Sequence, residues 1–240
     1  MKKIYFLALS CAIMLGLASC DPGEDKSQQV LYGYFSVVGS YPNYKFVEDG
    51  GTIVYPSPQS VADVTLGAGF GNNKRVQFTA YFYPKDMITT DDVTEVNNAT
   101  LQQGSVIPVD YPITMAKAEK DSINVADSIF TVKSLGSWWV SNGYLTTNFI
   151  ANYSVVNSAA IVPTTKLCLT SISDNAINFT LYYNRHTKKD TEYSEANFTY
   201  SFDITNISVP GNDSVTVTFD TEGIKSSYLK IPRSAFNYAK

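Results

Sequence analysis

Apolar residues occupy every second position in three segments of the C-terminal half, and this alternation most constrains the fold. The segments are residues 177–183, 198–204 and 215–219. Since successive side chains of a strand point to opposite faces, each segment predicts a strand with one buried face. Such strands need a second layer to cover them, which favours two packed sheets. We therefore expect an immunoglobulin-like β-sandwich over residues 111–240.

Turn residues separate the predicted strands of this sandwich. Asn142-Gly143 stands between residues 138–140 and 144–153, and Asp174-Asn175 stands between residues 165–172 and 177–183. An Asn-Gly pair between two strands is a strong hairpin signal, because both residues adopt positive φ readily. The sequence thus predicts antiparallel neighbours at both places.

The N-terminal half also favours strands. Residues 30–38, 45–47, 52–55, 61–66 and 75–83 have strand-like composition, and the acidic and glycine residues 48–51 suit a tight turn. Five short strands are the number found in an OB-like barrel, which we expect over residues 29–110. The polar segment 86–103 is expected to be a loop with a short helix from Thr90, because Asp91 and Asp92 suit a helix N-terminus. The predicted fold class is all-β.

The N-terminus has the organisation of a lipoprotein signal peptide. Lys2 and Lys3 precede an apolar segment, residues 4–17, that is too short for a membrane span. Leu17, Ala18, Ser19 and Cys20 then read as a lipobox, which predicts removal of residues 1–19 and lipidation of Cys20. An ordinary secretory peptide with a chance cysteine is the alternative. Residues 20–28 are polar and are expected to be a tether.

A multiply acylated Cys20 would attach the chain stably to a membrane, because a single acyl chain binds only reversibly. We therefore expect an outer-membrane lipoprotein whose membrane partner is its own N-terminal lipid anchor. The acidic residues at positions 21–25 resemble a surface-export signal, and a solvated linker explains them equally well. A periplasmic and a surface-exposed location both stay open.

The net charge of the chain argues against nucleic-acid binding. The formal charge of the chain is −4, and removing Lys2 and Lys3 from its 18 basic residues leaves −6 against 22 acidic residues. Such a chain is not expected to bind nucleic acid, which requires a basic surface.

The cysteines are not expected to form a disulfide within the chain. Cys11 leaves with the signal and Cys20 is acylated, so no intrachain disulfide is expected at Cys168. Cys168 is expected to be a small packed residue.

Several short motifs resemble, in order, the landmarks of NigD-like lipoproteins of Bacteroidetes. They are residues 138–145 (Trp-Trp-Val-Ser-Asn-Gly-Tyr-Leu), 181–186 (Leu-Tyr-Tyr-Asn-Arg-His), 200–203 (Tyr-Ser-Phe-Asp), 46–52 (Phe-Val-Glu-Asp-Gly-Gly-Thr) and 74–76 (Lys-Arg-Val). The resemblance covers nearly the whole mature chain. It implies an N-terminal OB-like domain and a C-terminal β-sandwich, it implies no activity, and it carries over no functional residue except Cys20.

The sequence contains no convincing catalytic, metal or cofactor site. Gly67, Gly69 and Gly71 precede a predicted strand, whereas a phosphate-binding loop opens a helix, so they are expected to form a connection. His186, beside Arg185, is the single histidine of the chain. Nucleophilic catalysis would need a serine and an acid near it, and a zinc site would need further ligands. We expect no enzymatic activity, no metal and no cofactor.

Aromatic and serine residues supply the remaining candidate sites. Trp138 and Trp139 are adjacent on a predicted strand, so they point to opposite faces, and one of them can offer a stacking surface together with Tyr144. Ser122, Ser128 and Ser214 each follow an aspartate and precede an aliphatic residue, a pattern resembling Bacteroidetes O-glycosylation acceptors. Ordinary turn serines are the alternative.

Together these features favour a non-enzymatic lipoprotein that binds a partner, either a protein or a glycan. The competing hypothesis is a surface glycan-binding lipoprotein that uses exposed aromatic rings. A hydrolase is the third hypothesis, and it requires two carboxylates that face each other across a cleft.

Overall fold

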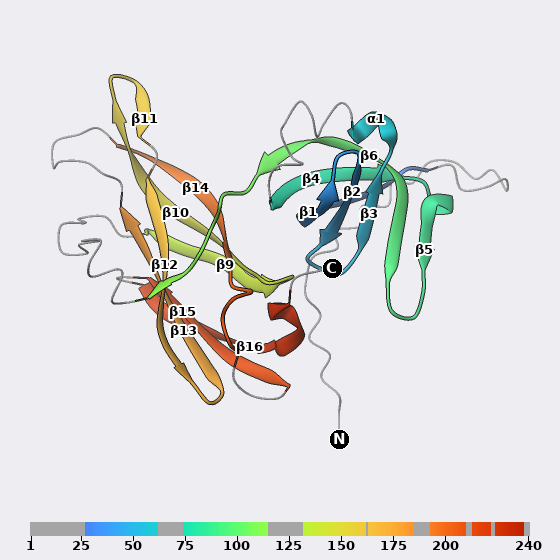
Figure 1. Cartoon of the computed structure of the whole chain (residues 1–240). Helices are drawn as coiled ribbons and strands as arrows, with labels where there is room; N and C mark the ends of the chain where they lie inside the picture. The colour runs from blue at the N-terminus through green and yellow to red at the C-terminus, as the bar shows by residue number, and fades with distance from the viewer. Residues whose placement is uncertain are drawn as a thin grey trace. The chain divides into compact units, whose positions relative to one another are not determined.

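Strands make up most of the described chain, accompanied by one α-helix (Figure 1). The computed structural model describes residues 27–61, 74–114, 132–161, 163–184, 193–209, 213–221 and 224–237. Contacts divide the chain into two units, with the change between Ile107 and Pro108. The all-β prediction is confirmed.

The first unit contains six strands, one short α-helix and one 3-10 helix in its described part. They are β1 (Gln29–Ser40), β2 (Asn43–Glu48), β3 (Ile53–Pro56), α1 (Pro58–Ser60), β4 (Arg75–Phe82), the 3-10 helix Pro84–Asp86, β5 (Met87–Thr89) and β6 (Thr94–Val106).

The strands of the first unit close into a barrel. Their order is β3-β2-β1-β4-β6, and β3 also pairs with β6 in parallel, which joins the two ends of the sheet. β5 adds a further antiparallel strand beside β6. A closed barrel of five strands is therefore confirmed, although β6 takes the place of the strand expected at residues 61–66. Closure removes the exposed edges that an open sheet would present.

Aromatic residues fill the barrel. Phe35 on β1 stacks on Phe78 on β4 with ring centroids 4.0 Å apart, and Phe46 on β2 meets Phe78 edge-on at 5.0 Å. All three are fully buried. Stacked and edge-on pairs stabilise a core beyond the area that they bury. The alternate residues of the same strands consequently face outward, as the two-residue period of a strand requires.

Two details of the first unit differ from the sequence prediction. The expected helix from Thr90 is wrong: Thr90 and Val93 hydrogen-bond to each other in a turn between β5 and β6. The polar segment that follows is a strand, because Val96, Ala99 and Leu101 supply buried contacts that its composition does not reveal. Val61, where a strand was expected to begin, follows α1, and residues 62–66 lie outside the described chain.

The second unit contains short and long strands that belong to two sheets. They are β7 (Val109–Asp110), β8 (Ile113–Thr114), β9 (Ser134–Ser141), β10 (Tyr144–Val156), β11 (Ala159–Ile161), β12 (Thr164–Ser173), β13 (Ala176–Asn184), β14 (Tyr193–Asp203), β15 (Ser214–Thr221) and β16 (Ile224–Pro232), followed by the 3-10 helix Arg233–Phe236.

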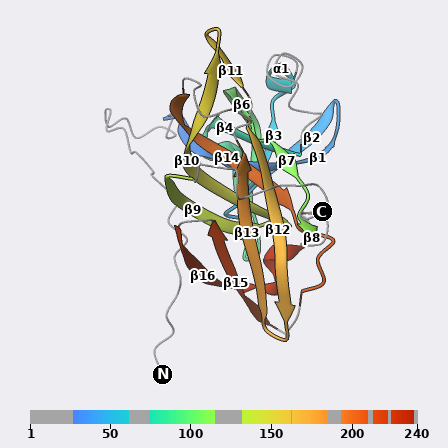
Figure 2. The same ribbon diagram turned by 90° about the vertical axis from the view of Figure 1, so that its left-hand side faces the viewer.

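The two sheets share one core. One sheet has the order β11-β10-β14-β7 with β9 beside β10, and the other has the order β16-β15-β13-β12-β8 (Figure 2). Side chains from both sheets form a single cluster that includes Phe149, Phe179 and Phe202. The two sheets therefore bury their side chains against one another, and the β-sandwich stays a prediction. The immunoglobulin-like topology stays a prediction, since β13 and β15 pair in parallel.

The hairpins of the second unit follow the turn signals. Ser141 pairs with Tyr144, and Asn142 and Gly143 between them have φ values of 51° and 78°. Positive φ at both central residues is the tight turn that Asn-Gly favours, so the hairpin prediction is confirmed. Ser173 likewise pairs with Ala176 around Asp174-Asn175.

Candidate interaction surface

The outer side of β1, β4 and β6 carries tyrosine, glutamine and threonine side chains. Register places Val30 opposite Tyr81 and Tyr32 opposite Thr79 between β1 and β4, and Thr79 opposite Gln102 between β4 and β6. We name the set the Tyr–Gln face. Its members are Val30, Tyr32, Tyr34, Gln77, Thr79, Tyr81, Thr100 and Gln102.

Two hydrogen bonds hold tyrosine rings in this face. The Gln77 amide donates to the Tyr32 hydroxyl, and the Tyr81 hydroxyl donates to the Gln102 Oε1 at 3.1 Å. Both bonds join diagonal neighbours on adjacent strands, which lie within reach of long side chains. Tyr32 nevertheless exposes 61% of its surface and Val30 exposes 50%. The face thus offers to solvent an aromatic ring whose hydroxyl accepts a hydrogen bond.

No member of the Tyr–Gln face is charged. The next pair of residues on this side of the sheet, Ser36 on β1 and Arg75 on β4, is fully buried, and Asp49 neutralises the charge of Arg75. The Arg75 guanidinium binds Asp49 through Nη1–Oδ1 at 2.7 Å and Nη2–Oδ2 at 2.6 Å. Nη1 also donates to the Ser36 hydroxyl at 3.0 Å. No local pattern revealed this face, because it requires the pairing of β6 with β4 and residues 86–103 were expected to form a loop.

The Asp49–Arg75 ion pair fixes the turn between β2 and β3 against β1. Besides its carboxylate contacts, Asp49 donates its backbone N–H to the Tyr34 carbonyl at 3.0 Å. Two parallel charge-assisted hydrogen bonds set the geometry of a guanidinium and a carboxylate more strictly than a single bond does. The motifs at residues 46–52 and 74–76 therefore meet in space, and the Asp49–Arg75 pair lies at one end of the Tyr–Gln face.

Glu48 is buried beside this ion pair. Its Oε2 accepts a hydrogen bond from the Gly50 N–H at 2.9 Å, and a Cβ added at Gly33 would lie 3.2 Å from its Cγ. Burial raises the pKa of Glu48, while the hydrogen bond from Gly50 opposes that shift. The pKa is also raised by the neighbouring charge of Asp49 and lowered by a hydrogen bond from Thr52 and by Arg75. Glu48 is thus a buried acid that supports the turn.

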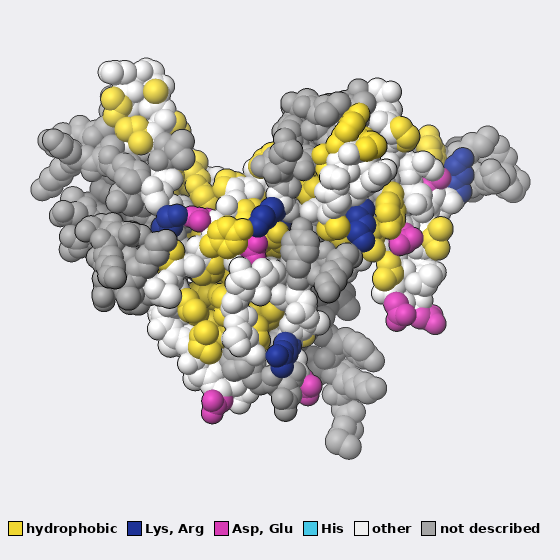
Figure 3. Space-filling model, in the orientation of Figure 1, with side chains coloured by type: hydrophobic (Ala, Val, Ile, Leu, Met, Phe, Trp, Pro, Cys, Tyr) yellow, Lys and Arg dark blue, Asp and Glu magenta, His cyan; other side chains and the backbone are white. Residues whose placement is uncertain are grey.

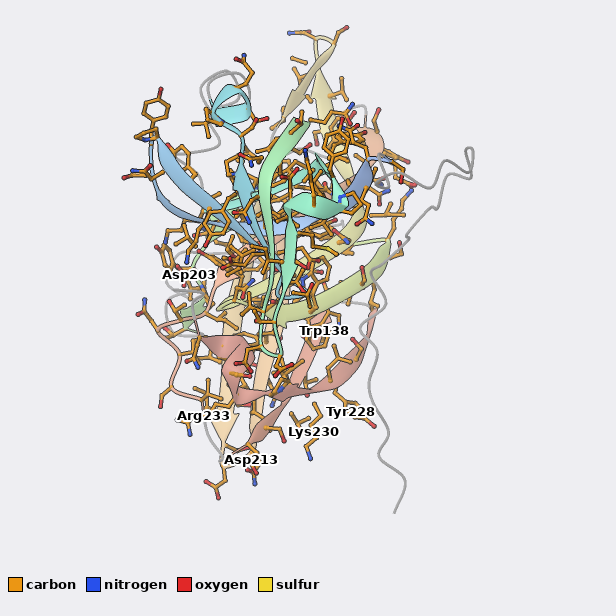
Figure 4. The ribbon with its side chains drawn as sticks, turned by 90° about the vertical axis from the view of Figure 1, so that its right-hand side faces the viewer. Trp138, Asp203, Asp213, Tyr228, Lys230 and Arg233 are labelled. Carbon is orange, nitrogen blue, oxygen red and sulfur yellow. The ribbon has the colours of Figure 1, made fainter. Side chains whose placement is uncertain are left out.

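Trp138 does not form part of an exposed surface. Only 7% of its surface is accessible, its indole N–H donates to the Ser227 hydroxyl at 2.6 Å, and its ring lies 5.3 Å from Phe219 (Figure 4). The expected role of Trp138 as a stacking surface is corrected, because the ring closes the core between β9 and β16. A buried indole normally has a hydrogen-bond partner of this kind.

Tyr144 is also an interior residue. It is fully buried at the start of β10, directly after the Asn142-Gly143 turn, so its expected place on a ligand surface is corrected too. Trp139 points to the other side of β9 and is half-buried. The prediction that Trp138 and Trp139 point to opposite faces of one strand is correct. Which of the two rings faces the second sheet could not be predicted, because that depends on strands far away in the chain.

The other predicted site residues are placed as follows. Cys20, Ser122, Ser128, Arg185, His186 and Gly67, Gly69 and Gly71 lie outside the described residues. Ser214 is half-buried at the start of β15. Cys168 is fully buried on β12, as expected of a small packed residue, and burial raises the pKa of its thiol.

Charged side chains are scattered on the face of the molecule shown in Figure 3, where hydrophobic and uncharged polar side chains surround them. Within the described ranges, no group of three or more His, Cys, Asp or Glu side chains is placed to hold a metal ion. The described part of the chain also contains no helix with the length and apolarity of a membrane span.

The fold of this chain is similar to the folds of solved structures from Bacteroides species. No protein-family model matches the sequence, and a search of curated proteins found no significant match. A candidate lipoprotein from Bacteroides fragilis is 13% identical, with a TM-score of 0.52 over 88% of this chain and 100% of that one. A DUF1344 protein of unknown function from Bacteroides vulgatus is 15% identical, with a TM-score of 0.50 over 85% and 90%.

The similar structures also include a NigD-like immunity protein. This protein, from Bacteroides caccae, is 14% identical, with a TM-score of 0.44 over 85% of this chain and 92% of that one. NigD-like and candidate lipoprotein structures of Bacteroides thus occur among the structures that the comparison found. The fold comparison itself rests on the two structures with the higher TM-scores.

Proposed function

We propose that the chain is an outer-membrane lipoprotein that acts by binding a partner and catalyses no reaction. Cys20 carries its lipid, and the two β units extend from the tether. The lipobox and the fold shared with a candidate lipoprotein support attachment through a lipid. The partner is a protein or a glycan.

The exposed Tyr–Gln face is the single observation that carries the binding proposal. Aromatic residues are enriched at recognition surfaces because they give large contact areas at a low cost in conformational entropy. Tyr32 is such a residue, and its hydrogen bond to Gln77 restricts the ring before any partner arrives. Trp139 contributes a second, smaller aromatic surface on the second unit, consistent with the competing proposal of a glycan-binding lipoprotein.

Two finer proposals concern the second unit. We expect its two sheets to form an immunoglobulin-like sandwich, since they share one core. We also expect Ser122, Ser128 and Ser214 to be O-glycosylation acceptors in a Bacteroidetes host. The mass of the intact native protein tests the second proposal, because each sugar adds at least a hexose-sized increment. A mass equal to that of the lipidated polypeptide removes it.

Two measurements test the proposed function. Radiolabelled palmitate should enter the wild-type protein and be absent from Cys20→Ala, and the labelled protein should fractionate with the outer membrane. Wild-type lipoprotein used as bait on native outer membranes should then retain a binding partner that Tyr32→Ala bait does not retain. Equal retention by both baits, or none by either, contradicts binding through this face.

A further inference from the structure

We infer that the Tyr–Gln face binds a neutral polysaccharide, with Tyr32 as the stacking surface and Gln77 and Gln102 as hydrogen-bonding groups. This inference rests on the proposed binding function and names the chemistry of the partner. It differs from the hypothesis based on Trp138, Trp139 and Tyr144, which lie in the second unit and of which Trp138 and Tyr144 are buried.

The Tyr–Gln face combines an exposed aromatic ring with amide side chains. One face of a sugar ring is lined by C–H groups that pack on an aromatic ring, and its hydroxyls both donate and accept hydrogen bonds. A glutamine amide has two donors and an acceptor oxygen with two lone pairs. The bonds to Tyr32 and from Tyr81 use one donor of Gln77 and one lone pair of Gln102. Each amide therefore keeps donor and acceptor capacity beside the exposed ring of Tyr32.

The charge of the chain and of this face favours a neutral ligand. A mature chain of net charge −6 repels acidic polymers, and the Tyr–Gln face has no cation to attract them. Arg75, the nearest outward cation on β4, is fully buried and bonded to Asp49. Neutral hydroxyl groups avoid the high cost of desolvating a charge at the interface. A neutral ligand is consequently the one that complements this surface.

The side-chain composition of the Tyr–Gln face favours a glycan over a protein partner. A stable protein interface buries about 800 Å² per partner around a largely apolar centre. Val30 is the single aliphatic member of the Tyr–Gln face, and the remaining members are hydroxyl- and amide-bearing side chains. Amide groups that flank an aromatic ring suit a ligand with many hydroxyls. Because the face runs across three adjacent strands, it accommodates a chain of sugars better than an isolated one.

The test is electrophoresis of the full mature protein in native gels that contain a polysaccharide. The probes are starch, mixed-linkage β-glucan, mannan and galactan as neutral polymers, with polygalacturonate as an acidic one. Wild-type protein should be retarded by at least one neutral polymer and not by polygalacturonate. Tyr32→Ala and Gln102→Ala should each raise the dissociation constant obtained from the retardation about tenfold, which is about 1.4 kcal/mol of binding free energy.

Matched variants separate loss of the site from loss of the fold. Tyr228→Ala is the control, because Tyr228 exposes 73% of its surface on β16 of the second unit (Figure 4). It should be retarded as strongly as the wild type. Tyr32→Phe keeps the ring and loses the hydroxyl that Gln77 holds, so it should show an intermediate loss. The melting temperature of each variant should match that of the wild type.

Three results would overturn the inference. The first is no retardation of the wild type by any neutral polymer, and the second is equal retardation of wild type and Tyr32→Ala. The third is a partner protein, or a second copy of the chain, that binds through Tyr32 while no polysaccharide does. This third result leaves the proposed binding function standing, whereas wild-type bait that retains nothing from native membranes removes the binding function as well.

Discussion

Asp49, in the turn after β2, receives two hydrogen bonds from the buried guanidinium of Arg75 on β4. The two residues are 26 positions apart, and their contact joins two motifs that the sequence presents separately. The pair holds the turn at one end of the Tyr–Gln face and removes the charge of Arg75 from the surface. It therefore links the stability of the barrel to the surface that we propose as a binding site.

Asp49→Asn should destabilise the protein by about 3–5 kcal/mol, because it leaves a buried guanidinium without its counter-charge. Urea unfolding of the mature protein measures this loss. The double variant Asp49→Leu with Arg75→Met removes both charges and should recover most of the stability. If Asp49→Asn unfolds at the same urea concentration as the wild type, the ion pair does not hold the turn.

Glu48→Gln should stabilise the protein at neutral pH. Because burial raises the pKa of Glu48 above its ordinary value of 4.5, the acid contributes stability that is fully present below pH 4.5. That contribution is lost as the pH rises through the folded-state pKa. The free energy of unfolding of Glu48→Gln should therefore exceed that of the wild type by an amount that grows as the pH rises above 4.5.

Denaturant unfolding at a series of pH values checks this trend. Glu195→Gln is the matched control, since Glu195 is exposed in the second unit and pairs with Lys133. The difference in unfolding free energy between Glu195→Gln and the wild type should not grow with pH in this way. An advantage of Glu48→Gln that is constant from acid to neutral pH would show that Glu48 is not a destabilised buried acid.

Trp138→Phe should cost about 1–3 kcal/mol, because it removes the hydrogen bond to Ser227 and part of the packing on Phe219. Ser227→Ala removes the hydrogen bond alone and should cost about 1 kcal/mol. Fluorescence supplies a further check on the two tryptophans. Trp139→Phe, which retains Trp138, should emit at shorter wavelength and resist acrylamide quenching more than Trp138→Phe does. The reverse order would place Trp138 at the surface.

Gly104→Ala should disrupt the pairing of β6 with β4. A Cβ at this position would lie 1.9 Å from the Gln77 carbonyl oxygen and 2.7 Å from Phe78 Cβ, so the strands would have to separate. We expect a loss of about 1–3 kcal/mol, as for other overpacked sites. Gly51→Ala is the comparison, because its cost comes from a φ of +101° with no atom in the way. Equal stability of Gly104→Ala and the wild type would contradict the β4–β6 register.

Local pattern predicted much of this fold. The alternation of Ile177, Phe179 and Leu181 placed a strand correctly, and Asn142-Gly143 placed a hairpin, because both signals depend on residues adjacent in the chain. Neither signal contains the pairing of β3 with β6 that closes the barrel. The polar segment before Gln102 was predicted incorrectly because its few buried residues are spaced irregularly around Asn98, which has a φ of 52°.

The candidate site was harder to predict than the fold. Burial of Trp138 depends on Ser227, which is 89 residues away, so no local pattern could place the ring inside. The Tyr–Gln face likewise requires the register of β1, β4 and β6, which brings Tyr32 next to Gln77 across 45 residues. Its uncharged residues appear ordinary in each strand taken singly. They form a surface only when the strands are paired.

Photo-crosslinking from position 32 in cells most directly tests whether the Tyr–Gln face is the binding surface. A photoreactive phenylalanine analogue replaces Tyr32 in the full chain, and the same analogue at Tyr228 of the second unit is the control. We predict adducts to another envelope component from position 32 and none from position 228. Adducts of equal yield from both positions, or adducts from position 228 alone, would contradict a binding role for the Tyr–Gln face.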